Sequence, residues 1–399
     1  MNNTPQSLRL HIGFYGRCNA GKSSLINAIS GQTVVIVSDV AGTTTDPVVK
    51  SMEIGGIGAC SLIDTAGFDD RSPLGEARRQ QSLRAADKTD VAVVVCGAQS
   101  DYSLEREWVE MFRGRGVPVV VVLGKSDMLV SAKTTAEAIA DQLGVEPIVV
   151  SASERSGIEK LMGAITDAAQ RADRSADRSI LGGLVERGDR VVLVMPQDAQ
   201  APAGRLILPQ VQTIRELLDR GCTAVCCQPD ELLGTLAAFA TAPKLVITDS
   251  QVFARVAECV PQGVALTSFS VLMACYKGDA KAFVEGAKAI DTLTEQSRVL
   301  IAEACTHAPA SEDIGRVKLP RMLRAKVGEA LSVDVVGGSD FPSDLTPYDL
   351  VIHCGACMFN RRHVLSRLER AAEQGVPMTN YGMAIAHLTG VLPRVVMPE

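Results

Sequence analysis

Five side chains that can bind a metal stand in two short clusters in the last third of the chain. Cys305 and His307 form the first cluster, and His353, Cys354 and Cys357 form the second. Tetrahedral zinc sites take three thiolates and one imidazole, whereas iron–sulfur clusters take thiolates, normally four. The two clusters therefore predict a metal centre for either zinc or an iron–sulfur cluster. The alternative is a set of buried core thiols, because free cysteine is among the most buried residue types.

Apolar runs precede both clusters and are expected to position them. Residues 299–302 come before the first cluster and residues 350–352 before the second, and both runs are typical of buried strands. In open α/β sheets, ligands bind beyond the carboxyl ends of parallel strands. Two neighbouring strands would therefore bring both clusters to one crevice. Residues 361–374 form an amphipathic stretch that predicts a helix, whose amino end would favour thiolates.

A phosphate-binding loop is predicted near the beginning of the chain. Residues 16–24 are Gly-Arg-Cys-Asn-Ala-Gly-Lys-Ser-Ser, between a predicted strand at 8–15 and a predicted helix at 25–29. In such a loop, successive backbone N–H groups and the helix dipole bind phosphates. Lys22 is expected to reach the β- and γ-phosphates, and the Ser23 hydroxyl to ligate magnesium. The nucleotide contacts expected here are Asn19, Ala20, Gly21, Lys22, Ser23 and Ser24.

Two later stretches are suited to binding magnesium and the γ-phosphate. Residues 42–46 form a polar loop typical of a first switch, in which Thr44 is the better magnesium ligand and Thr43 the alternative. A predicted strand ends near Asp64, which would hold magnesium through water, and the N–H of Gly67 would sense the γ-phosphate. Both stretches follow the phosphate loop in the order that a GTP-binding domain requires.

The residues expected to recognise the base come next. A predicted strand at 119–123 leads to Lys125 and Asp127, and another at 148–150 leads to Ser151 and Ala152. The Asp127 carboxylate can accept two hydrogen bonds from N1 and N2 of guanine, which adenine does not offer. The small residues after position 150 would let the chain pass against the base. With the phosphate loop, these motifs predict a GTP-binding α/β domain.

This half of the chain resembles the translation-factor-type GTPases, and among them the TrmE/Era-like group that contains the tRNA-modification GTPases. In that group an asparagine of the phosphate loop, here Asn19, helps to ligate potassium. The resemblance therefore implies hydrolysis stimulated by K+. Gly124 departs from the pattern because the base-reading motif normally begins with asparagine, and its side chain ties the base to the phosphate loop. Weaker guanine affinity is expected as a result.

The position after Gly67 also departs from the pattern. Phe68 stands there in place of a water-positioning glutamine, and a phenyl ring cannot orient water by hydrogen bonding. Water must then be placed by the potassium ion or by one of three acids, and the sequence does not choose among Asp69, Asp70 and Glu76. We assign no catalytic residue and expect slow intrinsic hydrolysis.

The 399-residue chain is long enough for two or three domains. We predict three α/β domains: a GTPase domain over 8–170 with a mostly parallel sheet, a small parallel domain over 175–265, and a second small parallel domain over 266–399 that carries the cysteine clusters. The middle domain shows predicted strands at 190–195, 223–227 and 244–248 but no catalytic constellation. We therefore expect it to mediate self-association.

Composition argues against several classes of partner. The net charge is −6 and there is no basic block, which disfavours nucleic-acid binding. The longest apolar runs are strand-sized, so we expect no membrane span. Eleven cysteines without a signal peptide indicate a reducing interior, and hence a cytoplasmic protein.

Over its full length the chain resembles the GTPase family of FeFe-hydrogenase maturation, called HydF. The resemblance rests on residues 9–12 and 41–48, and above all on the ordered Cys-x-His and His-Cys-x-x-Cys clusters. It implies a 4Fe-4S cluster on Cys305, Cys354 and Cys357, with an exchangeable fourth ligand that His307 or His353 could fill or flank. It also implies a homodimer formed through the middle domain.

The family resemblance implies a task as well. Such a protein holds a di-iron precursor built by two radical-SAM enzymes and delivers it to the apo-hydrogenase, while nucleotide hydrolysis governs the exchange of partners. One alternative is an RNA- or ribosome-associated GTPase with a structural zinc domain, which salt-sensitive RNA binding would favour. Another is a redox-sensing cluster protein with GTP as a secondary ligand, which a cluster-loaded protein unable to activate apo-hydrogenase would favour.

Overall fold

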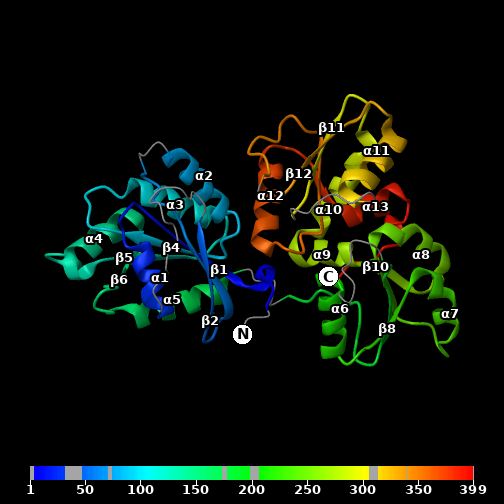
Figure 1. The fold of residues 1–399 in the computed structure, drawn as a ribbon, viewed down its shortest axis with the longest axis horizontal. Coiled ribbons are helices and arrows are strands. Elements are labelled where there is room, and N and C mark those ends of the chain that lie inside the picture. Colours follow the sequence, from blue (N-terminus) through cyan, green and yellow to red (C-terminus); the bar gives the residue numbers. More distant parts are fainter. Residues whose placement is uncertain are drawn as a thin grey trace. The chain divides into compact units, whose positions relative to one another are not determined.

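The computed structural model describes residues 4–31, 47–70, 74–172, 178–197, 206–304, 313–338 and 340–398. The chain divides into two compact units, Met1–Arg174 and Ser175–Glu399 (Figure 1). The first unit contains one sheet and the second contains two. This arrangement confirms the predicted fold class of a GTPase-type sheet followed by two smaller parallel sheets. None of the described helices is long and apolar enough to cross a membrane.

The sheet of the first unit has six strands in the order β2-β3-β1-β4-β5-β6, and only the β2–β3 pair is antiparallel. Every residue of β1 and β4 is buried, as expected for parallel strands covered by helices on both faces. The strands are β1 (Leu10–Gly16), β2 (Val48–Ile54), β3 (Gly58–Asp64), β4 (Val91–Cys96), β5 (Val119–Leu123) and β6 (Ile148–Val149). The helices are α1 (Lys22–Ser30), α2 (Gly75–Ala86), α3 (Ser103–Gly114), α4 (Ala132–Leu143) and α5 (Ile158–Arg171).

The second unit begins with a four-stranded parallel sheet in the order β10-β9-β7-β8. Its central strands β7 and β9 are short apolar runs, whereas β8 is an edge strand with exposed residues. The strands are β7 (Arg190–Val194), β8 (Thr223–Cys227), β9 (Leu245–Thr248) and β10 (Ala265–Ser268). The helices are α6 (Leu208–Asp219), α7 (Leu232–Ala237), α8 (Phe253–Cys259) and α9 (Phe269–Lys277).

The second sheet of this unit is also parallel, in the order β12-β11-β13-β14. Its register sets Ala302 beside His353 and His353 beside Asn380, so the carboxyl ends of three strands meet at one edge. The strands are β11 (Arg298–Ala302), β12 (Ser332–Val336), β13 (Leu350–His353) and β14 (Met378–Asn380). The helices are α10 (Ala280–Lys288), α11 (Leu319–Val327), α12 (Arg361–Glu373) and α13 (Tyr381–Leu388), and a π-helical turn (Ile314–Lys318) precedes α11.

The two sheets of the second unit share one hydrophobic core. Val192 and Val246 of the first sheet belong to the same buried cluster as Leu300 and Val351 of the second. Helix α9 contacts α6 and β10 on one side and α12 and α13 on the other (Figure 1). The chain also returns from the second sheet to the first, because the N–H of Val396 donates to the carbonyl of Leu266 at 2.9 Å.

The predicted boundary at 265/266 falls inside β10, which is a full member of the first sheet. Three strands of this sheet are predicted from the sequence, whereas β10 is not. Strand β10 is only four residues long and runs directly into the apolar helix α9. No polar turn separates the two elements, so the usual signal for the end of a strand is missing.

Two glycines allow close packing around α9 and α10. A side chain at Gly286 of α10 would place its Cβ 2.1 Å from the carbonyl oxygen of Met378 in β14. A side chain at Gly382 of α13 would place its Cβ 2.6 Å from Cβ of Ser270 in α9. Both helices can therefore lie against their neighbours only without a side chain at these positions.

We predict that Gly286→Ala lowers the free energy of unfolding by about 2 kcal/mol, because the added methyl group meets backbone rather than a movable side chain. Thermal and denaturant unfolding would measure the change. Gly234→Ala in α7 is the matched control, since nothing lies within 4 Å of its Cβ and alanine is favoured in a helix. Equal midpoints for the two variants would contradict the prediction.

Candidate functional site

The phosphate loop lies where the sequence predicts it, between the carboxyl end of β1 and the amino end of α1. Gly21 caps α1 with a left-handed backbone, φ 103°, which a residue with a side chain rarely adopts. Lys22 is buried, and its Nζ donates to the carbonyls of Gly16 at 3.0 Å and Arg17 at 2.8 Å. Burial lowers the pKa of this ammonium, and the carboxylate of Asp64 opposes the shift.

The side chains of Ser23 and Asp64 are in contact beside the phosphate loop and form an oxygen-rich site. The Ser23 hydroxyl donates to Oδ2 of Asp64, while Oδ1 of Asp64 is buried without a hydrogen-bond partner among the described residues. Burial raises the pKa of this carboxyl. A hard divalent cation prefers oxygen ligands of this type, and it would supply the missing partner of Oδ1. The predicted switch residues Thr43 and Thr44 lie outside the described residues.

The stretch after β3 packs tightly against the phosphate loop. A Cβ at Gly67 would lie 2.4 Å from the backbone nitrogen of Cys18, so only glycine fits there. The N–H of Phe68 donates to the carbonyl of Gly16 at 3.4 Å. Its ring stacks on Trp108 with centroids 5.5 Å apart and is 8% exposed. Phe68 is therefore a core residue, which explains why the position carries no water-positioning side chain.

The three acids considered for placing water have different contacts. Asp69 accepts a hydrogen bond from the N–H of Cys18 in the phosphate loop, at 2.6 Å. Asp70 is paired with Arg78 at 2.7 Å, and Glu76 accepts from the side chain of Gln80. Of these contacts, the bond between Asp69 and Cys18 reaches the phosphate loop.

The base-recognition residues converge at the ends of β5 and β6. Asp127 accepts hydrogen bonds from the hydroxyls of Ser151 at 2.6 Å and Ser153 at 2.9 Å, and these bonds lower the pKa of its carboxyl. Lys125 has a left-handed backbone, φ 55°, and its side chain lies beside Gly21 of the phosphate loop. The structure thus brings the predicted Lys125, Asp127 and Ser151 to one end of the sheet, beside the phosphate loop.

Gly124 fits a space in which a side chain would not. Its Cβ would lie 2.8 Å from the carbonyl oxygen of Ala20 in the phosphate loop and 3.3 Å from Val95. Gly124 replaces the usual asparagine at a point where the backbone of the phosphate loop lies too close for a side chain.

The second predicted centre lies in the other unit, at the carboxyl end of β13. The Sγ atom of Cys354 accepts hydrogen bonds from the N–H of Ala304 at 3.0 Å and the N–H of Ala356 at 3.4 Å. Ala304 comes two residues after β11, so the thiol joins the ends of two neighbouring strands. Burial raises the pKa of this thiol to about 11, and the two N–H groups oppose the rise.

Cys305 and His307 lie outside the described residues, although Cys305 is the residue that follows Ala304 in the chain. Within the described ranges, no three histidine, cysteine or acidic side chains gather closely enough to hold a metal ion. Cys354 and Cys357 both lie in those ranges, on the loop of residues 354–360 between β13 and α12 (the cysteine loop), and neither forms a disulfide.

His353 is held by two hydrogen bonds that use both of its ring nitrogens. Nη1 of Arg367 donates to Nε2 at 2.8 Å, so Nδ1 carries the proton and donates to the carbonyl of Cys354 at 2.8 Å. The ring is 1% exposed, and burial together with the charge of Arg367 lowers its pKa to about 3. In this arrangement His353 is a neutral neighbour of the cysteine loop with no nitrogen directed at a metal.

A buried lysine at the end of α9 donates hydrogen bonds to the cysteine loop. Lys277 at the end of α9 is 1% exposed, and its Nζ donates to the carbonyls of Ala356 at 2.9 Å, Cys357 at 3.2 Å and Phe359 at 2.7 Å. An ammonium has three N–H donors, and all three are used. Burial lowers its pKa to about 8. These bonds stabilise the left-handed backbone of Ala356, φ 51°.

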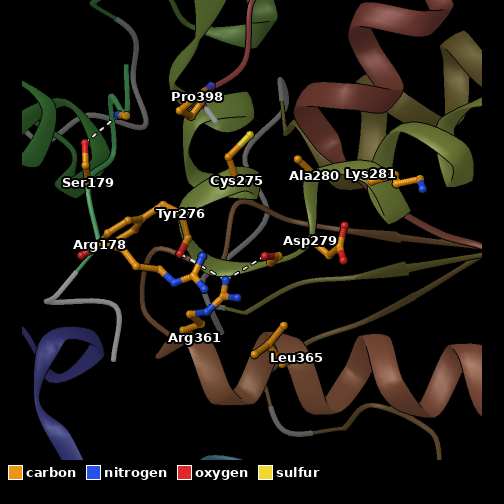
Figure 2. A pocket seen from close by; sticks show the side chains of 12 residues that line it. Arg178, Ser179, Cys275, Tyr276, Asp279, Ala280, Lys281, Arg361, Leu365 and Pro398 are labelled. Atoms are coloured by element: carbon orange, nitrogen blue, oxygen red, sulfur yellow. Dashed lines mark hydrogen bonds between the residues drawn. The ribbon is translucent and has the colours of Figure 1, made fainter. Parts of the chain in front are cut away.

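An arginine makes the reciprocal contact. Arg361 begins α12 just after the cysteine loop, and its Nη1 donates to the carbonyls of Gly278 at 2.7 Å and Tyr276 at 3.4 Å (Figure 2). Figure 2 shows Tyr276 at the carboxyl end of α9, and Tyr276 and Gly278 line a pocket together with Arg178 and Leu365. The end of α9 and the cysteine loop are thus joined by two cations in opposite directions.

Sequence reasoning missed Lys277, Arg361 and Arg367, which hold the loop but lack metal-ligating groups. The one available signal was Lys277, a single cation that ends the apolar run 269–277. Its three acceptors are backbone carbonyls some eighty residues later, which no pattern of side chains reveals.

Comparison with known proteins shows what the chain resembles. Over 125 residues it is 38% identical to GTPase Der of Limosilactobacillus reuteri, covering 30% of this chain and 29% of that protein. Over 156 residues it is 35% identical to tRNA modification GTPase MnmE of Paraburkholderia xenovorans, covering 38% and 32%. The chain thus spans less than a third of these curated relatives. The G domain of the T. maritima FeoB iron transporter aligns with 41% of this chain and 99% of that chain, at 22% identity and a TM-score of 0.31.

Three family models divide the chain among them. Residues 11–125 match the 50S ribosome-binding GTPase model, which identifies a GTPase domain around the phosphate loop. Residues 180–278 match the hydrogen maturase F dimerization domain, and residues 281–398 match the hydrogen maturase F tetramerization domain. The latter two models together cover more than half of the chain and include both the lysine at 277 and the cysteine loop. The chain therefore belongs to the hydrogen maturase F (HydF) family.

Proposed function

We propose that this protein is a GTP-hydrolysing scaffold for FeFe-hydrogenase maturation. It holds a 4Fe-4S cluster, receives a di-iron precursor from radical-SAM maturases and delivers it to the apo-hydrogenase. The proposal is carried by the Cys354 thiol, which accepts the N–H of Ala304 and so ties the end of β13 to the residue just before Cys305. Membership of the hydrogen maturase F family supports the same reading.

The residues present suit a cluster with three protein ligands. Thiolates are the usual ligands of iron–sulfur clusters, and N–H···S hydrogen bonds such as those to Cys354 stabilise ligand charge. Cys305, Cys354 and Cys357 would hold three irons. Bound there, the cluster would offer one iron that can accept and release a bridging ligand.

The fourth iron would be bound by a ligand other than His353, because neither nitrogen of its ring is available. Both of its nitrogens are hydrogen-bonded, to Arg367 and to the carbonyl of Cys354. His353 would then flank the cluster and fix the backbone of its ligand, while His307 or an exogenous group takes the exchangeable position. A scaffold benefits from such a position because delivery requires the last bond to break.

The nucleotide site supports GTP and Mg²⁺ as cofactors of the first unit. Lys22, Ser23 and Asp64 stand in the phosphate-loop arrangement, and the buried Oδ1 of Asp64 fits a cation site. Asn19 is exposed at the tip of the loop with φ 59°, which suits it to ligate K+ from its side-chain carbonyl. Hydrolysis at this site would change partner affinity through the switch residues.

For the oligomerisation that the family models name, we propose a homodimer formed through the first sheet of the second unit. Strand β8 is an edge strand, and α6 beside it exposes Val211 and Leu218, which are 47% and 60% exposed. Residues seven apart lie on one face of a helix. An open strand edge beside an apolar helix face is a natural place for a second copy to associate.

Anaerobic reconstitution with iron and sulfide tests the metal centre. We expect about four iron atoms per wild-type chain and loss of most of that iron in Cys305→Ala, Cys354→Ala and Cys357→Ala. Cys226→Ala, at an exposed thiol of β8, is the control that should keep full iron content. Zinc alone in anaerobically purified protein, or equal iron in all variants, would exclude the scaffold role.

The role of Asn19 is tested by hydrolysis rates in K+ and in Na+. We expect slow GTP hydrolysis that is about tenfold faster in K+, a difference of about 1.4 kcal/mol in the barrier. Asn19→Gly should remove the K+ effect, because glycine keeps the left-handed backbone but lacks the carbonyl ligand. Its nucleotide affinity serves as the control. If K+ still accelerates hydrolysis in this variant, the ion is bound by residues other than Asn19.

Sedimentation or light scattering tests the association surface. Leu218→Glu should shift the protein toward monomer by at least tenfold in dissociation constant, because it would bury a charge in an apolar contact. Met128→Glu is the matched control, since Met128 is 74% exposed in the GTPase unit. An unchanged dissociation constant in Leu218→Glu would show that the interface lies elsewhere.

A further inference from the structure

Tyr381 begins α13 one residue beyond Asn380, the last residue of β14, at the edge where the strand ends meet. Its ring belongs to the apolar cluster against which Cys354 packs, and the residue is 9% exposed. Its hydroxyl is buried and has no hydrogen-bond partner among the described residues. An unpaired buried hydroxyl destabilises a protein, so such a group in a native site calls for an explanation.

The space around this hydroxyl is kept open by a glycine. A Cβ at Gly315 would lie 2.0 Å from the Tyr381 oxygen and 2.8 Å from Oε1 of Glu303. Gly315 belongs to the π-helical turn, a rare conformation that is frequently found at functional sites. The glycine and the unusual turn therefore accommodate a hydroxyl that has no hydrogen bond to any described residue.

Glu303, whose carboxylate also lies beside Gly315, is already paired. Oε2 of Glu303 accepts from Nε of Arg316 at 3.1 Å and from Nη2 at 2.9 Å. Burial, and next the charge at Cys354, raise the pKa of the Tyr381 phenol. The hydroxyl has no acceptor among the described residues, and it is therefore available as a donor.

We propose that the Tyr381 hydroxyl donates a hydrogen bond to a sulfur atom of the cluster held at Cys354, either the thiolate or a neighbouring sulfide. The inference rests on the cluster proposed above and assigns to Tyr381 the part of a positioning residue. The hydrogen bond favours the reduced cluster, because reduction adds negative charge at the sulfurs that accept it. Gly315 provides the room that this bond needs.

Tyr381→Phe removes one oxygen and keeps the ring, so the fold should be retained. In the reconstituted full-length protein, we expect the equilibrium constant for reduction to fall about tenfold, a potential 59 mV lower for one electron. Redox titration followed by electron paramagnetic resonance measures it. Tyr348→Phe is the matched control, because its hydroxyl donates to Asp334 of the outer strand β12 and should leave the potential unchanged.

A second measurement detects the proton itself. Electron–nuclear double resonance of the reduced wild-type cluster should show a coupled exchangeable proton that disappears in D₂O and in Tyr381→Phe. Gly315→Ala should reproduce the lower potential, since its methyl group displaces the hydroxyl. The double variant Tyr381→Phe/Gly315→Ala should add little to either single change.

The possible outcomes separate the two proposals. A wild-type protein that binds no cluster overturns the scaffold function and this inference together. A wild-type protein that binds the cluster, with the same potential and the same proton signal in Tyr381→Phe, overturns the inference alone.

Discussion

The hydrogen bond from the N–H of Ala304 to the sulfur of Cys354 is the contact on which the proposed metal centre depends. It exists because β11 and β13 are neighbours in register, with Ala302 beside His353. A shift of one residue would turn the side chains of β13 to opposite faces of the sheet. The position of the thiol is therefore set by the sheet rather than by the loop alone.

The loop after Cys354 is held from outside the sheet that carries it. Lys277 satisfies three of its carbonyls, and Arg361 satisfies two carbonyls at the end of α9. Cations buried among carbonyls are costly to remove, because each lost bond leaves a polar group without a partner. The cysteine loop and the end of α9 are consequently fixed relative to each other by polar contacts as well as by the shared core.

Much of this arrangement could be predicted from the sequence, and the reasons for the remainder are physical. The phosphate loop is encoded locally, since strand, glycines, Lys22 and Ser23 follow one another within a few residues. The cysteine loop was predicted from its apolar strand and its close spacing. Strand β10 was missed because it is short and enters α9 without a turn. The contacts of Lys277 and Tyr381 were beyond reach because both depend on atoms far away in the chain.

The core shared by the two sheets of the second unit limits how either sheet can be replaced during evolution. Residues of β7, β9, β11 and β13 pack into one apolar cluster, and the segment after α13 returns to pair with β10. Exchange of either sheet by recombination would expose the part of that cluster which packs against it and break the lysine and arginine contacts. The two sheets are thus expected to be inherited as a single block. Substitutions in the core of one sheet would then have to preserve its packing against the other.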